Sequence, residues 1–189
     1  MKATDPMKAT DLLKAQHKVV EKLFAALEKT DDDAEEAKLF AELASNLVAH
    51  DGIEREIFYP ACEAKMGMTD LLGEALVEHG VIEFCLYEAN NALGGETFEF
   101  KLSVLQEMVE HHVEGEELEF FSTVEKAFDK EALTELGAKM EAAFQKNLRK
   151  DFRDPLFANL QQVLAGAIKP VPGEKNGAKK PQQRASASR

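Results

Sequence analysis

The sequence lacks the features of a disulfide-bonded, secreted or membrane-spanning protein. Its 189 residues include only Cys62 and Cys85, too few for a disulfide framework, so we expect a reducing, cytoplasmic setting and two buried thiols. No apolar run approaches the roughly 18 residues of a membrane-spanning helix. The first residues contain no apolar segment typical of a secretory signal. These absences predict a soluble protein with one domain of ordinary size.

Acidic residues outnumber basic ones outside the C-terminal end. The formal net charge is −12, although residues 169–189 carry six Lys or Arg and a single Glu. The rest of the chain is therefore strongly acidic, which repels nucleic acid and anionic membranes and tolerates cations. We expect neither of these two partners, and a monomer or weak dimer. The basic tail is interpreted as solubilising, with docking to an acidic partner as the alternative.

The alternating pattern of β-strands is also missing. Apolar residues instead recur every three or four positions, as on the buried face of a helix, between stretches of capping and turn residues. This pattern predicts an all-α, antiparallel up-and-down four-helix bundle over 5–128, a helical extension over 129–168 and a disordered basic tail over 169–189. The expected helices are 6–29, 32–65, 69–93, 97–128 and 130–149, followed by a shorter one after Pro155.

Each of the four long helices places a histidine on its apolar stripe, and three add a glutamate one turn later. Only five histidines exist, and the fifth, His111, adjoins one of these positions. Burying an unpaired carboxylate is very costly, so buried acids are paired or bind metal. A single His-x-x-x-Glu is weak evidence in a chain so rich in Glu, and the shared core face carries the argument. The stripe residues are His17, His50, Glu54, His79, Glu83, His112 and Glu116.

These residue types favour a particular class of metal site. Imidazole and carboxylate without cysteine suit iron, manganese or zinc. Four histidines and three glutamates are too many for one tetrahedral zinc ion and suit two metals, because carboxylates can bridge a metal pair. The Glu-x-x-His motif of ferritin-like bundles is absent, since no histidine here follows a Glu by three residues. The sequence therefore predicts a two-metal site inside the bundle.

Four segments together resemble one known family. They read DLLKAQHKVVEKLF, AHDGIEREIFYP, LVEHGVIEF and EHHVEGEELEFF, in this order, over about residues 11–128. Their order, spacing and flanking residues are similar to the hemerythrin-like, or HHE cation-binding, domains. This resemblance implies a four-helix bundle around a non-haem di-iron centre, with two iron ions joined by an oxo or hydroxo bridge. It also implies that Glu54 and Glu116 bridge the metals, that His17 and His50 bind one of them, and that His79 and His112 bind the other.

Three positions leave alternatives open within this resemblance. Glu83 stands where oxygen-carrying hemerythrins have a second histidine, and we take it as a metal ligand in preference to a neighbour of the ligands. His111 has the spacing to Glu116 seen in the carriers, but His112 repeats the spacing of the second helix and is preferred. Asp51, which follows the second-helix histidine, is a further candidate because some relatives use that acid.

The expected site has fewer histidines than an oxygen carrier, which argues against stable oxygen carriage. We therefore expect a di-iron protein that binds or responds to oxygen, nitric oxide or peroxide, with a role in oxidative stress. A weak peroxidase- or catalase-like activity stays open. The alternatives are iron storage or donation, iron–sulfur repair, and a partner-binding bundle stabilised by its metal. Phe58 and Phe120 should close the dry end of the pocket, while Tyr59 and Tyr87 are expected simply to pack there.

Overall fold

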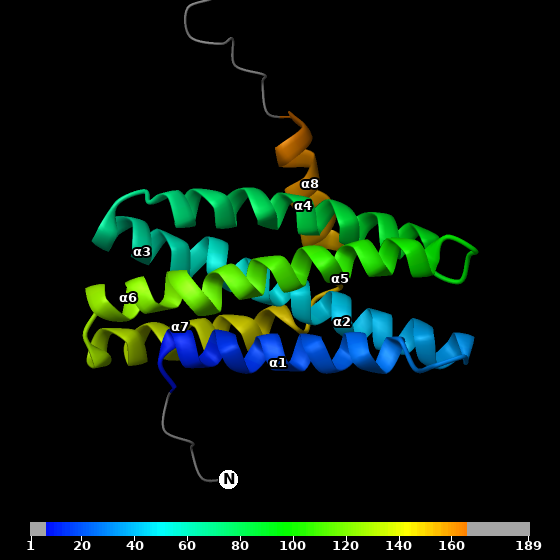
Figure 1. Ribbon diagram of the computed structural model, residues 1–189, viewed down its shortest axis with the longest axis horizontal. Coiled ribbons are helices and arrows are strands. Elements are labelled where there is room, and N and C mark those ends of the chain that lie inside the picture. The colour runs from blue at the N-terminus through cyan, green and yellow to red at the C-terminus, as the bar shows by residue number, and fades with distance from the viewer. Residues whose placement is uncertain (1–6, 166–189) are drawn as a thin grey trace, which may run out of the picture.

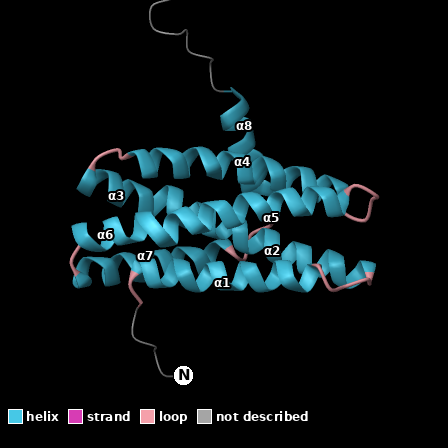
Figure 2. Cartoon of the chain, viewed as in Figure 1, coloured by secondary structure: helices cyan, strands magenta, loops and turns pink. Residues whose placement is uncertain are grey.

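The computed structural model describes residues 7–165, and every regular element in this range is a helix (Figure 2). This confirms the predicted all-α fold. The predicted disordered tail, 169–189, lies outside the described residues. The elements are α1 (Ala9–Leu27), α2 (Asp33–Ile53), the π-helix η1 (Glu54–Phe58), α3 (Tyr59–Met66), α4 (Asp70–Ala92), α5 (Phe98–Gly115), the π-helix η2 (Glu116–Phe120), α6 (Phe121–Ala127), α7 (Lys130–Asn147) and α8 (Arg153–Ala165).

Four long helical rods form the bundle. Two are the single helices α1 and α4, and the other two are α2–η1–α3 and α5–η2–α6, each continuous through a π-helix. In Figure 1 the rods lie side by side along the long axis of the molecule, with α4 beside α5 and α1 beside α2. Helix α7 packs against α1 and α2, and α8 leaves the bundle beside α4. The chain therefore forms an up-and-down bundle with two added helices.

Side-chain capping explains where several helices begin. Asp32 accepts a hydrogen bond from the backbone N–H of Glu35, at 2.8 Å, and Thr69 accepts one from Leu72, at 3.2 Å. These bonds satisfy backbone donors that have no partner inside the helix. The second and third rods consequently start within one residue of the positions predicted from the sequence.

The first helix starts later than the sequence predicts, at Ala9 instead of residue 6. Gly137 of α7 explains part of this difference, because the chain before α1 passes directly over it. A Cβ atom added at Gly137 would lie 2.2 Å from the carbonyl oxygen of Met7. Lys8 has an extended backbone, with ψ 153°. The extended segment that leads into α1 thus packs closely on α7, and only a glycine at position 137 leaves room for it.

Two π-helices interrupt the rods that we expected to be uninterrupted α-helices. Each π-helix begins at a glutamate of the expected metal site. In the first, the N–H of Tyr59 donates to the carbonyl of Glu54, five residues earlier. In the second, the N–H of Phe121 donates to the carbonyl of Glu116. A π-helix fits an extra residue into one turn, and such turns are frequent at functional sites. Here they bring two consecutive aromatic residues of each rod into the core: Phe58 with Tyr59, and Phe120 with Phe121.

Two apolar clusters occupy the two ends of the bundle. One contains Phe24, Phe40, Leu86 and Leu105, and the other contains Phe58, Phe120, Phe121 and Met140. Along the first, third and fourth rods, the buried histidines and glutamates fall between the residues of these two clusters, and in the second rod His50 and Glu54 follow Leu47 of one cluster and precede Phe58 of the other. A polar layer is therefore enclosed between two apolar ones.

Helix α8 belongs to the first of these apolar clusters. Its residues Leu156 and Leu160, together with the preceding Phe152, are buried against residues of the other helices. This packing fixes α8 beside α4.

None of the helices within residues 7–165 is both long enough and apolar enough to cross a bilayer.

Candidate metal centre

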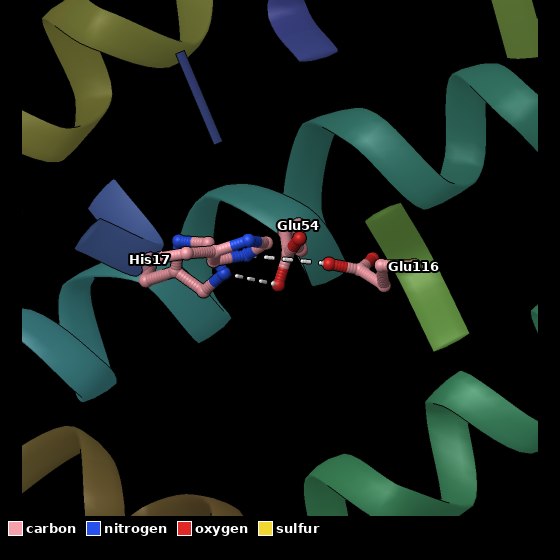
Figure 3. A group of neighbouring side chains, drawn as sticks. His17, Glu54 and Glu116 are labelled. Atoms are coloured by element: carbon pink, nitrogen blue, oxygen red, sulfur yellow. Dashed lines mark ion pairs between the residues drawn. The ribbon is translucent and has the colours of Figure 1, made fainter. Parts of the chain in front are cut away.

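Histidine and glutamate side chains from all four rods meet in the polar layer. Figure 3 shows His17, Glu54 and Glu116 converging at its centre. The candidate ligand atoms form two groups, and the atoms of each group all lie within 4.8 Å of one another. The first group is His17, His50, Glu54 and Glu116, and the second is Glu54, His79 and His112. Six of the seven predicted ligands are thus brought together, and Glu54 belongs to both groups.

The helical spacing of each His-x-x-x-Glu motif produces part of this geometry. Residues four apart lie on one face of a helix, so their side chains meet. In the second rod, Nε2 of His50 lies 3.0 Å from Oε2 of Glu54. In the fourth, the corresponding distance between His112 and Glu116 is 3.7 Å.

Contacts between different rods complete the two groups. In the first, Nε2 of His17 lies 3.5 Å from Oε2 of Glu116. In the second, Nε2 of His79 lies 3.3 Å from Oε2 of Glu54 and 3.1 Å from Nε2 of His112. Two imidazole nitrogens and a carboxylate oxygen facing one another at such distances form a set of donors that suits a metal ion.

The outer nitrogen of each histidine is held by a separate polar partner. Nδ1 of His17 lies 2.8 Å from Glu117, and Nδ1 of His50 lies 2.8 Å from Gln16. Nδ1 of His79 lies 2.5 Å from Asp51, and Nδ1 of His112 lies 2.8 Å from Glu78. Metal-binding histidines commonly use their second ring nitrogen in this way, because the bond fixes the orientation and tautomer of the ring. All four rings therefore present Nε2 to the interior of the layer.

Several buried polar atoms at the centre have no hydrogen-bond partner among the described residues. They include both carboxylate oxygens of Glu54, Oε2 of Glu116 and Nε2 of His17. The nearby His50 ring lies at ion-pair distance from Glu54 but does not form an aligned hydrogen bond with it. Because buried charged groups are normally paired or bound to metal, these unpartnered atoms fit a centre built to hold cations.

The charges of the centre shift the pKa values of its members. Burial alone would raise the pKa of Glu54, but the nearby positive charges of His50 and His79 hold that pKa well below its usual value. Burial alone would lower the pKa of His79, but its hydrogen bond to Asp51 and the nearby negative charge of Glu54 raise it to about 10. A metal ion that binds Nε2 of His79 must therefore displace a proton.

Tyr59 reaches the centre, whereas the sequence favoured simple packing. Its buried hydroxyl donates to Oε1 of Glu116 at 3.0 Å and lies 2.9 Å from Nε2 of His79. Burial, followed by the charges of Glu54 and Glu116, raises the pKa of Tyr59 well above its usual value. The available signal was its position directly after Phe58, since two adjacent buried aromatics indicate an irregular helical turn. Tyr87 instead packs, partly buried, on the apolar cluster that includes α8.

Glu83, which we expected to bind metal, lies outside both groups of ligand atoms. Its carboxylate accepts hydrogen bonds from Asn159, at 2.6 Å, and from Arg55, at 3.2 Å. Asp51 also lies outside the groups and faces the outer nitrogen of His79. The side chain of His111 is 71% exposed, so the structure brings His112 to the centre.

A small cavity of about 40 Å³ adjoins the centre. All four histidines contribute to its wall, and the rest is largely apolar, with Val20, Leu86, Val109 and Val113 among the lining residues. Phe58 and Phe120, whose ring centres are 6.0 Å apart, are buried in the apolar cluster beyond the centre, as expected for the closure of its dry end.

A surface groove of about 520 Å³ runs between α1 and α5 beside this cavity. The cavity and the groove share four lining residues, whose side chains separate the one from the other: His17, Val20, Val109 and Val113. The groove also contains several acids and one Lys: Lys18, Glu21, Glu28, Glu110, Glu114 and Glu117.

A helical bundle whose rods enclose two overlapping groups of buried His and Glu defines a metal-binding class of protein. The chain belongs to the hemerythrin HHE cation binding domain family, which matches residues 8–124 and confirms the resemblance noted in the sequence. A solved hemerythrin HHE cation binding domain-containing protein from Mycobacterium kansasii has a similar fold, with 25% identity and a TM-score of 0.70. The match covers 82% of this chain and 99% of that one. No curated protein matches the chain significantly.

Proposed function

We propose that the protein binds two iron ions in this centre and responds there to oxygen, nitric oxide or peroxide. The observation that carries the proposal is the set of buried, unpartnered atoms of Glu54, Glu116 and His17. The inward-facing imidazoles of His50, His79 and His112 complete this set. Glu54 suits a bridging role because it belongs to both groups. The proposed terminal ligands are His17 and His50 on one ion and His79 and His112 on the other.

The apolar cavity supports a small, neutral ligand. On the same scale of volume, roughly 10–15 Å³ suffices for one water molecule, so 40 Å³ holds only a few atoms. When bound, the iron pair supplies redox chemistry and a coordination position for such a ligand. The valines exclude bulk water, and the hydroxyl of Tyr59 holds a proton within hydrogen-bond distance of Glu116 and His79.

The acidic groove supports selectivity by charge at the entrance to the cavity. Its excess of Glu over Lys disfavours anions and leaves neutral gases and hydrogen peroxide unaffected. The same charge attracts cations, which favours iron storage or donation as the second candidate function. Glu117 links the groove to the centre, because its carboxylate accepts from the outer nitrogen of His17.

Metal content and the ultraviolet–visible spectrum of anaerobically purified protein test the proposal. Two irons per chain, with a near-ultraviolet band that changes reversibly on exposure to oxygen or nitric oxide, are the expected result. Rapid loss of iron to a weak chelator without a response to gases would favour iron donation. Zinc, a single metal or none, with a silent spectrum, would refute the di-iron function and point to a structural or partner-binding bundle.

A further inference from the structure

Helix α8 contributes one polar side chain to the surroundings of the metal centre. The amide of Asn159 donates to Oε1 of Glu83 at 2.6 Å and lies 3.4 Å from Oδ2 of Asp51. Both acids are buried, and they come from different rods, α4 and α2. Asn159 therefore joins three helices at one point.

The two acids need such donors because they lie close together in a buried position. Like charges at short range repel, and burial strengthens the repulsion. Arg55 bridges them on one side, donating to Asp51 at 2.6 Å and to Glu83 at 3.2 Å. Asn159 bridges them on the other side. The Asp51 carboxylate is thereby fixed by two donors in addition to its bond with His79.

This network reaches only one of the four histidines. Asp51 orients His79 through its Nδ1 atom. The outer partners of the other rings, Gln16, Glu78 and Glu117, form no hydrogen bond with the described side chains of α8. The two proposed metal positions are therefore supported unequally. Among the described residues, a hydrogen-bonded chain from α8 reaches the position formed by His79 and His112, and none reaches the position formed by His17 and His50.

We propose that Asn159 is a positioning residue, through which the docking of α8 sets how firmly the metal at His79 and His112 is retained. The chain that links them is Asn159 to Asp51, and Asp51 to His79. Helix α8 lies beyond residues 8–124, the part of the chain that the family model matches. The inference rests on the proposed two-metal function.

The packing of α8 places Asn159 without any help from the polar network. Leu156 and Leu160, on either side of Asn159 in the sequence, are buried in the apolar cluster. Replacing Asn159 should therefore leave α8 in place and remove only the donors. This separates the positioning role from a general loss of packing.

Two variants and one control test the inference in full-length, iron-loaded protein. Asn159→Ala removes the amide, and Asn159→Asp replaces it with a carboxylate of the same size that repels both acids. Gln161→Ala, at an exposed position of the same helix, is the control. The rates at which a strong chelator removes the two irons are measured, together with the two ⁵⁷Fe Mössbauer signals.

One iron should leave the Asn159→Ala protein about ten times faster than the wild type, the usual range for loss of an outer partner being roughly 10- to 100-fold. Asn159→Asp should have at least this effect, and only one Mössbauer signal should change. The second iron and the control should behave as in the wild type. Wild-type rates for both irons, or equal acceleration of both, would overturn the inference. Fewer than two irons in the wild type would refute the proposed function itself, and the inference with it.

Discussion

Replacing Glu54 with glutamine is the sharpest test of the proposed centre. Glu54 is 0% exposed, lies within 3.3 Å of both His50 and His79, and belongs to both ligand groups. Glutamine keeps the size of the side chain but removes the negative charge that a bridging ligand supplies. We expect Glu54→Gln to lower the metal content from two ions to at most one, with a loss of affinity on the order of 100-fold or more.

The size of the effect on thermal stability follows from mass action. A metal present at 1,000 times its dissociation constant stabilises the folded state by about 4 kcal/mol. For a domain of this size each kcal/mol shifts the Tm by roughly 2–4 °C, so each lost site should remove about 8–16 °C of metal-dependent stabilisation. The quantity to measure is the difference in Tm between the metal-loaded and metal-free forms of each variant, by circular dichroism. This difference cancels any effect of the mutation on the metal-free fold.

Glu56→Gln is the matched control, because Glu56 lies in the same π-helix and is exposed. It should keep both metals and the full metal-dependent shift in Tm. Glu116→Gln should give a metal content and a metal-dependent shift in Tm between those of Glu54→Gln and Glu56→Gln, since Glu116 belongs only to the group of His17 and His50. If Glu54→Gln retains two metals and the full shift, the assignment of Glu54 as the bridge is wrong.

Three further predictions concern the entrance, the protonation and the packing of the bundle. Val113→Phe should slow the binding of nitric oxide about tenfold in stopped-flow measurements, because Val113 separates the groove from the cavity, whereas exposed Val104→Phe should not. The apparent affinity for Mn²⁺ should rise by about tenfold per pH unit from pH 6.5 to 8.5, because a metal must displace the proton that His79 retains up to a pKa of about 10; a flat profile in a chelator competition would contradict this. Gly137→Ala should lower the free energy of unfolding by about 1–3 kcal/mol, measured with urea, because its Cβ would meet the carbonyl of Met7; unchanged stability would show that this contact relaxes freely.

The helices and the inward-facing histidines could be predicted because their causes are local. Capping side chains such as Thr69 mark helix ends, and residues four apart share one face of a helix whatever surrounds it. The convergence of the rods then follows from burying their apolar stripes. His50 and Glu54 are an example, since their spacing alone brought them together.

The missed features depend on contacts that the local sequence does not specify. Spacing on the core face gave Glu83 the same expected role as Glu54, but Arg55 and Asn159 offer it other partners. Asn159 is 76 residues away from Glu83 in the chain, and no periodic pattern predicts that contact. The reach of Tyr59 into the centre depends on the π-helix before it, which an α-helical periodicity of 3.6 residues does not anticipate.

The π-helices divide two of the rods into segments that follow different phases. An extra residue in one turn rotates everything that follows by about 100° relative to an unbroken α-helix. Before Glu54 and Glu116 the inward face is set by the histidines, and after them it is set by the aromatic residues 58–59 and 120–121. The candidate metal centre therefore lies where the helical phase changes. Tyr59 and Phe121 face the same side of their rods as the ligands, although the α-helical repeat that joins His50 to Glu54 and His112 to Glu116 does not include them. If the same residues formed an unbroken α-helix, Tyr59 and Phe121 would be rotated by about 100° away from the ligands of their rods.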